Sequence, residues 1–192
     1  MSHLITSVEE LTPQRLTEIL YRNHHLQEGD VSTIIERSTE TTLVSMISYL
    51  DVIYSPNSQG GPEHLFLKLP KPETAPVDTK EICFYARHPA RMNASPSVPC
   101  YDAAYDSGSG LSHLLLQDVS HTHATIPWPV SPRRLHAERT IDAFAELHCS
   151  FWNHDQLWTE FGGLPSDEII DNPGNLDHQF AMFVDFMGDR LS

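Results

Sequence analysis

The stretch that decides the fold is HLFLKLPKPETAPVDTKEICFYA, residues 64–86. Its first part alternates leucines with other side chains, which is the period of a β-strand, and Pro70 ends the run. Asp78 or Thr79 can cap the helix that follows, which we expect to run to about residue 87. A strand followed closely by a helix is therefore the centre of the predicted fold.

Lys68 and Glu81 are the charged residues of this stretch that bear on function. Lys68 shares its strand face with Phe66, opposite the leucines. A lysine on a face that leans toward the interior needs an anion nearby, because an unpaired buried charge is strongly destabilising. Glu81, on a helix packed across the sheet, is the candidate partner. The alternative is a solvated strand lysine and an ordinary first-turn glutamate that the helix macrodipole favours.

The residues around this stretch predict a small antiparallel α+β lobe. Thr12 and Pro13 begin an amphipathic helix, as an N-cap followed by proline at the first helical position. Two segments have strand composition, and the polar segment 37–41 between them is predicted to be a turn. A later pair of strand-like segments flanks DSGSG, a typical hairpin turn. The four strand-like segments are 31–36, 42–54, 101–105 and 111–117.

Beyond Asp118 the pattern becomes helical. A loop with three prolines spans 121–132, and residues 132–152 form a strong helix pattern with one apolar stripe. We expect Trp152, at the end of this stripe, to belong to a core. Further helical stretches lie around 166–170 and 175–191, so the sequence predicts two parts, an α+β lobe at 1–118 and a helical part at 119–192.

Composition excludes several classes of protein. The chain has 192 residues, 40% hydrophobic and 20% charged, which is typical of a folded domain. Its formal net charge of −14 argues against nucleic acid, whose phosphates it would repel. No apolar run approaches the roughly 20 residues that span a bilayer, so we expect no membrane insertion. Three cysteines without paired spacing, and an N-terminus without signal-peptide features, favour a reducing, cytoplasmic location.

The histidines raise the question of a metal site, which the sequence pattern does not favour. His121 and His123 lie in the proline-containing loop, and His148 lies on an apolar helix stripe beside Cys149. No Cys-x-x-Cys or His-Glu-x-x-His pattern occurs, and a histidine satisfied within the core is commoner than a metal ligand. We therefore expect no metal site, and we interpret Cys100 and Cys149 as core thiols rather than nucleophiles.

Several segments, taken in order along the chain, resemble the aminoglycoside phosphotransferase superfamily, and especially its choline and ecdysteroid kinase-like branch. They are LFLKLP (65–70), KEICFYAR (80–87), VPCYDAAYD (98–106), HLLLQDVS (113–120), IDAFAELHCSFW (141–152) and FMGDRLS (186–192). The resemblance is collinear from about residue 10. It implies a protein-kinase-like fold, with an N-terminal lobe of antiparallel sheet and one packed helix, joined to an incomplete helical C-terminal lobe.

For function, the resemblance implies an ATP-dependent phosphotransferase, a kinase that acts on a hydroxyl of a small molecule. Lys68 would bind the α- and β-phosphates of ATP, and Glu81 would orient that lysine. Backbone groups around Gln117, Asp118 and Val119 would meet the adenine. The implied cofactors are ATP and Mg²⁺.

The sequence also departs from the family pattern. Residues 38–42 stand where the family has its phosphate-covering turn, but they contain no glycine, and Gln117 stands where the family often has glutamate. The sequence has no His-Gly-Asp motif, and DFMG at 185–188 has one residue too many to be an Asp-Phe-Gly motif. We therefore expect a chain truncated before the catalytic loop, without the catalytic Asp and Asn and without the Mg²⁺-binding Asp.

Two functions remain open at this point. The first is part of a phosphotransferase that has little or no activity as this chain alone. The second is a non-catalytic, kinase-derived module that binds a nucleotide or a protein. In the second case a protein partner would cover the exposed surface of the helical part.

Overall fold

The structure is a computed structural model that describes residues 4–71, 79–87, 96–123, 130–152, 180–182 and 184. The chain divides into two compact units, Met1–Asn153 and His154–Ser192. The helical stretches expected around 166–170 and 175–191 lie almost entirely outside the described residues. The elements of the first unit are η1 (Val8–Glu10), α1 (Pro13–Arg22), β1 (Leu26–Glu28), β2 (Val31–Thr41), β3 (Ser45–Tyr54), β4 (Gln59–Gly60), β5 (His64–Pro70), α2 (Thr79–Arg87), β6 (Cys100–Asp106), β7 (Leu111–Gln117) and α3 (Arg134–Phe151).

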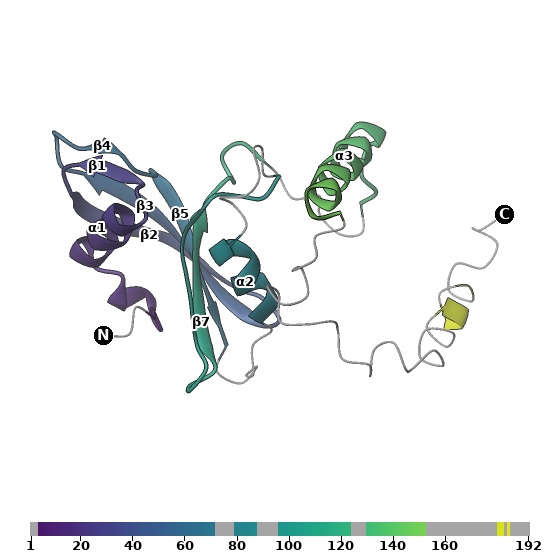
Figure 1. The fold of residues 1–192 in the computed structure, drawn as a ribbon, viewed down its shortest axis with the longest axis horizontal. Coiled ribbons are helices and arrows are strands. Elements are labelled where there is room, and N and C mark those ends of the chain that lie inside the picture. The colour runs from purple at the N-terminus through teal and green to yellow at the C-terminus, as the bar shows by residue number, and fades with distance from the viewer. Residues whose placement is uncertain are drawn as a thin grey trace. The chain divides into compact units, whose positions relative to one another are not determined.

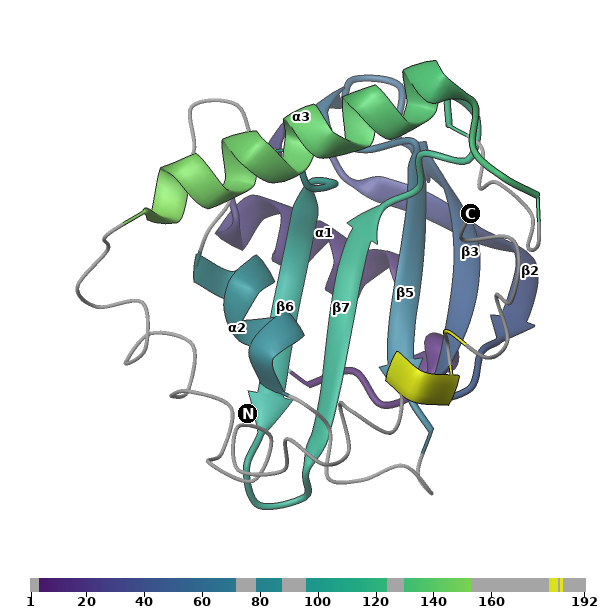
Figure 2. The same ribbon diagram turned by 90° about the vertical axis from the view of Figure 1, so that its right-hand side faces the viewer.

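The described residues form the expected mixed α+β fold with an antiparallel sheet. Five strands pair in the order β2-β3-β5-β7-β6, and β1 and β4 form a separate two-stranded ladder. The strands of the main sheet lie side by side in the face-on view of Figure 2. Residues 64–86 thus supply the central strand β5 and the helix that follows it, as the sequence predicted.

The turn predicted at 37–41 is wrong, because β2 continues through these residues to Thr41. Threonine favours a strand, and on a strand exposed along both faces the polar residues of this segment give no apolar alternation. The chain turns instead over Thr42 to Ser45, where the Thr42 amide donates to the Ser45 carbonyl and the Thr42 hydroxyl accepts from the Ser45 amide.

Helix α1 covers one face of the sheet. Its N-cap, Thr12, accepts a hydrogen bond from the Arg15 amide, and Pro13 occupies the first helical position, as predicted. The helix buries Leu16 and Leu20 against the leucines of β5 that point to this side. This cluster is the main core of the described residues, and it fixes which side chains of β5 face the other way.

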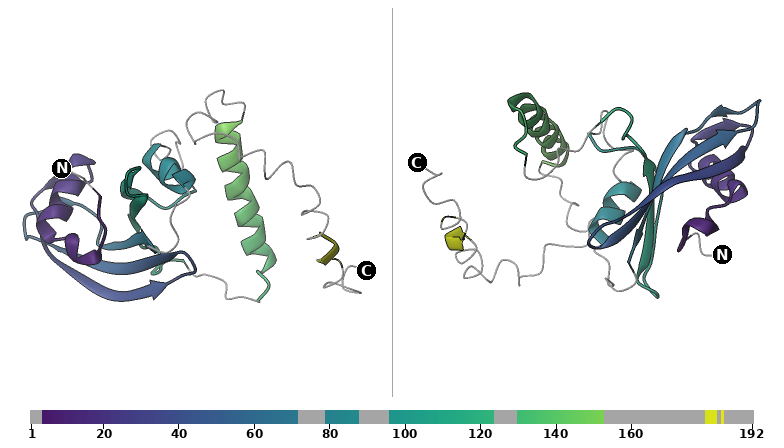
Figure 3. Two further views of the ribbon diagram at one scale, coloured as in Figure 1. Left: turned by 90° about the horizontal axis from the view of Figure 1, so that it is seen from below. Right: turned by 180° about the vertical axis from the view of Figure 1, so that it is seen from behind.

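Helix α2 lies on the opposite face of the sheet (Figures 1 and 3). Its buried Ile82 packs in a second, smaller cluster with Leu114 and Leu116 of β7, and Phe66 and Tyr85 lie against this cluster. The two clusters use alternate residues of the same strands, since Leu115 belongs to the first. Lys68 and Phe66, which alternate with the leucines of β5, consequently lie on the α2 face.

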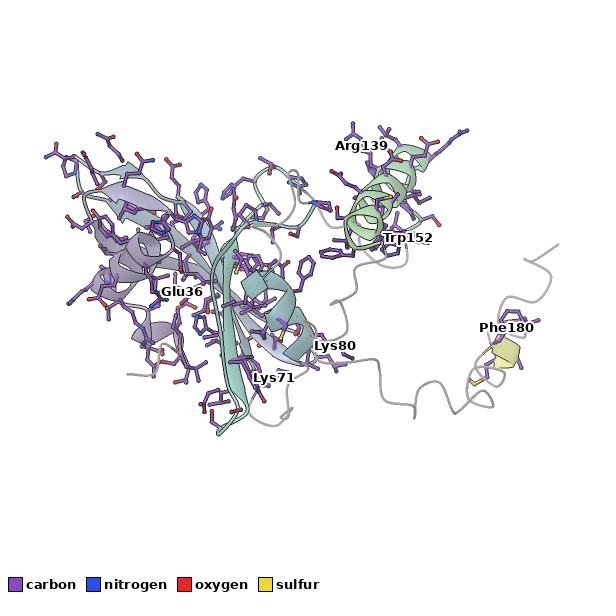
Figure 4. All side chains as sticks on the ribbon, viewed as in Figure 1. Glu36, Lys71, Lys80, Arg139, Trp152 and Phe180 are labelled. Atoms are coloured by element: carbon purple, nitrogen blue, oxygen red, sulfur yellow. The ribbon has the colours of Figure 1, made fainter. Side chains whose placement is uncertain are left out.

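Helix α3 has no buried residue among those described. Its apolar stripe was predicted from the sequence, but the expectation that Trp152 belongs to a core is wrong, because this side chain is 76% exposed (Figure 4). Cys149 is exposed as well, not a core thiol. No described helix combines the length and the apolar character that crossing a bilayer requires.

Candidate functional site

Lys68 and Glu81 form an ion pair on the α2 face of the sheet. The Lys68 ammonium nitrogen lies 2.8 Å from Oε1 and 2.7 Å from Oε2 of Glu81, so the predicted pairing is confirmed. The Lys68 side chain is 26% exposed and the Glu81 side chain 47%, so solvent screens the attraction between them. The pair therefore contributes at most about 1 kcal/mol to the free energy of unfolding.

The sheet register and α2 hold the two side chains in place. Lys68 lies opposite Ile47 of β3 and opposite Leu114 of β7, while Glu81 directly precedes the buried Ile82. A cavity of about 30 Å³ adjoins the pair, which is room for a single water molecule. A larger anion must therefore reach the Lys68 ammonium from the solvent side.

The residues expected to meet adenine follow the end of β7. The amide of Gln117 donates to the Pro99 carbonyl, and the amide of Asp118 donates to the His64 carbonyl. These two donors are already used within the protein. The amide of Val119 has no partner within the described part of the chain, whereas its carbonyl accepts from the amides of the turn that follows. Of these three amides, Val119 is the one able to donate to a ligand.

The side chain of Asp118 makes contacts within the protein and is not available to a ligand. Its carboxylate pairs with the guanidinium of Arg37 and accepts a 2.8 Å hydrogen bond from the Ser120 amide. Burial acts to raise the pKa of Asp118, but the hydrogen bonds from Ser120 and Arg37 outweigh it, and the pKa lies below its ordinary value. The carboxylate is therefore ionised at neutral pH and is paired with Arg37.

A cluster of polar side chains, which sequence reasoning missed, lies next to this ion pair. Nε of Arg37 lies 2.8 Å from Oδ1 of Asp51, and Nδ1 of His64 lies 2.8 Å from the same oxygen. The His121 ring stacks on the His64 ring with centroids 4.2 Å apart. The sequence signal for the Asp51–His64 pair was their opposition in the β3–β5 register, which local spacing does not reveal.

The phosphate-covering turn implied by the resemblance is displaced from its expected place. Residues 38–41 belong to β2, and the turn itself begins at Thr42. Leu43, in the turn, is exposed, and the amide of Thr42 is committed to the Ser45 carbonyl. A turn without glycine whose first amide is occupied is poorly suited to wrap a phosphate group.

A second buried polar cluster connects the N-terminus to the β6–β7 hairpin. The amide of Ile5 donates to Nδ1 of the fully buried His113, so Nε2 of that ring carries the proton and donates to Asp102. Arg22 also contacts the Asp102 carboxylate. Burial acts to raise the pKa of Asp102, but the hydrogen bonds from His113 and Arg22 lower it further than burial raises it. All these groups have protein partners, which indicates a structural role.

Comparison of the chain with family models, with curated proteins and with solved structures finds no match. In chemical terms, the described residues offer the oriented ammonium group of Lys68 and the backbone amide of Val119 as donors. They can bind an anion, and the carboxylate that the described residues place against Lys68 is that of Glu81, which is engaged in the ion pair.

Proposed function

We propose that this chain is the nucleotide-binding part of an ATP-dependent phosphotransferase that acts on a small-molecule hydroxyl. The observation that carries the proposal is the Lys68–Glu81 ion pair. In kinases a lysine on the third strand pairs with a glutamate on the following helix and binds the α- and β-phosphates of ATP. Here Lys68 lies on β5, the third long strand of the main sheet in chain order, and Glu81 lies on the next helix.

The residues present fit parts of ATP. The Lys68 ammonium suits the phosphates, and Glu81 keeps it oriented on the α2 face. The Val119 amide suits an acceptor on the edge of the adenine ring. Mg²⁺ fits less well, because both oxygens of Glu81 contact Lys68, and the described cluster able to hold a metal lies elsewhere, at Asp51, His64 and His121. We therefore assign no step to Mg²⁺ at this site.

Transfer of the phosphoryl group needs a residue that orients the attacking hydroxyl, commonly an aspartate of a catalytic loop. The sequence contains no His-Gly-Asp motif, and the described residues place no carboxylate other than Glu81 against Lys68. We therefore expect this chain alone to bind ATP without transferring phosphate.

A non-catalytic interaction module is the second candidate. The exposure of Ile141 and Phe144 on α3, and of Trp152 directly after it, favours this candidate, because a group of exposed large apolar side chains is a common feature of protein-binding surfaces. The first candidate depends on the Lys68–Glu81 pair and takes part in phosphoryl transfer, whereas the second depends on the exposed side chains of α3 and involves no catalysis.

The test is calorimetric titration of ATP, with and without Mg²⁺, into the wild-type chain and the Lys68→Ala variant. We expect Lys68→Ala to weaken binding by about tenfold or more, equivalent to about 1.4 kcal/mol. Lys80→Ala is the matched control, since Lys80 lies beside Glu81 at the start of α2 and its loss removes the same charge (Figure 4). It should leave the affinity within about threefold of wild type.

Glu81→Gln separates the two members of the pair. It keeps the size of the side chain and removes its charge, so Lys68 remains but loses its orienting carboxylate. We expect ATP affinity between those of the wild type and Lys68→Ala. Absence of ATP binding by a folded wild-type chain, or equal affinity in Lys68→Ala and Lys80→Ala, would contradict the proposal.

A further inference from the structure

We propose that Asp51, His64 and His121 form a binding site for one Zn²⁺ ion. Two imidazole nitrogens and one carboxylate oxygen converge here, and the potential ligand atoms lie within 4.8 Å of one another. Imidazole nitrogen and carboxylate oxygen are both ligands that zinc takes, and zinc sites with three protein ligands leave a fourth position for water or a ligand. The inference is independent of ATP binding, because it uses none of the residues assigned to the nucleotide.

Secondary structure places the three ligands without any local sequence motif. Asp51 of β3 and His64 of β5 are direct partners in the antiparallel register, so their side chains leave the same face of the sheet as neighbours. His121 lies in the turn that follows β7, which is closed by hydrogen bonds from the amides of Thr122 and His123 to the Val119 carbonyl. This turn holds the His121 ring over that of His64, with 37° between the ring planes.

The surrounding charges favour a cation despite the guanidinium of Arg37. Arg37 contacts the carboxylates of both Asp51 and Asp118, so one positive charge is set between two negative ones and the cluster has a net negative charge. Each carboxylate has about four lone-pair positions, so Asp51 can hold Arg37 and a metal at the same time. Arg37 then acts as an outer partner that orients the ligating carboxylate.

Zinc binding requires a small change in the distances between these ligand atoms. Nδ1 of His64 is 2.8 Å from Oδ1 of Asp51, which is a hydrogen bond. Around tetrahedral zinc, with bonds of about 2.0–2.2 Å, two ligand atoms are separated by about 3.4 Å. Binding therefore requires the pair to open by about 0.6 Å. His121 is exposed, which gives the ion a path from solvent and allows its ring to adjust.

Bound zinc would cross-link three elements of the fold. Zinc would join β3 and β5 to the turn after β7, a segment that the Asp118 contacts also hold. Neither the sequence spacing of the histidines nor the Lys68–Glu81 pair suggests a metal site that joins these three elements. It follows from the strand register together with the position of the turn.

The test is titration of the metal-free full chain with Zn²⁺ by calorimetry, and with Co²⁺ as a visible-absorption probe of the ligand geometry. We expect saturable binding of one ion per chain. His64→Ala and His121→Ala should each weaken the affinity by about tenfold or more. His136→Ala, which removes an exposed histidine of α3, is the matched control and should bind as the wild type does.

His121→Ala is the decisive variant, because an exposed turn residue can be replaced without unfolding the sheet, which circular dichroism checks. His121→Cys should restore binding and add an intense sulfur-to-cobalt band, since thiolate is a strong zinc ligand. The proposal is overturned if the wild-type chain shows no saturable binding, or if His121→Ala binds as tightly as the wild type and His136→Ala.

Discussion

Arg37 of β2 and Asp118, the residue after β7, form an ion pair that joins two elements separated in the sheet by β3 and β5. The Asp118 carboxylate is nearly fully buried, and Arg37 reaches Asp51 of β3 as well. Arg37 can do this because β2 carries an irregularity between Glu36 and Ser38, which places an extra residue on that strand. A single guanidinium thus contacts the carboxylates of β3 and of the post-β7 segment.

Asp118→Asn should destabilise the chain by about 1–3 kcal/mol at pH 7, because a buried charge-assisted contact to Arg37 is lost. The pKa of Asp118 is lowered in the folded chain. Its contribution is therefore fully present above the unfolded-state pKa of about 3.9 and is lost as pH falls through the lower folded-state pKa. Urea unfolding between pH 7 and pH 3 should show the wild type and variant converging in acid. A difference that stays constant over this range would refute the assignment.

His113→Leu should lower the free energy of unfolding by about 2–4 kcal/mol. The substitution introduces an apolar side chain of similar size, but it leaves the Ile5 amide without its acceptor and removes one of the two donors to Oδ2 of Asp102, the other being Arg22. Arg22→Met is the comparison, since Arg22 contacts the same carboxylate from a partly exposed position. It should cost less than about 1 kcal/mol in the same urea experiment. Equal losses in both variants would show that burial does not set the cost.

Gly61→Ala should be more damaging than Gly110→Ala, although both glycines have positive φ angles, +87° and +70°. A Cβ at position 61 would lie 2.6 Å from Cζ of Tyr54, whose hydroxyl is fixed by a hydrogen bond to the Pro62 carbonyl. A Cβ at position 110 meets no atom within 4 Å. We expect about 1–2 kcal/mol of backbone strain at Gly110 and about 2 kcal/mol more at Gly61. Urea midpoints measure the difference, and a Gly110→Ala variant as unstable as Gly61→Ala would contradict it.

Local signals predicted much of the sheet and both helices packed on it. Thr12 with Pro13 indicated the start of α1, and alternating leucines indicated β5. The polar end of β2 was misassigned, because an edge strand exposed on both faces lacks the apolar alternation that distinguishes a strand from a turn. The two-residue β4 and three-residue β1 are too short to give any pattern.

The site was predictable only where local patterns determined it. Strand alternation set the face of Lys68, and the helix start set the position of Glu81, so their pairing followed. The cluster of Asp51, His64 and His121 depends on the register between two strands and on a turn far along the chain. A single sequence does not specify such long-range pairing. For α3, the periodicity of the sequence predicts an apolar stripe, but it does not predict whether another element covers that stripe. In the structure the stripe is exposed.

The two outer strands of the main sheet bear on how the chain behaves at high concentration. Open strand edges are templates on which a second chain can add, and flat apolar edges lead to aggregation. Here β2 and β6 both carry register irregularities, and their exposed residues include Glu36, Glu40 and Asp106. Carboxylates on both edges repel a second copy of the same edge, and the irregularities interrupt its hydrogen-bond ladder. The charges and the irregularities therefore disfavour the pairing of β2 or β6 with a strand of a second chain.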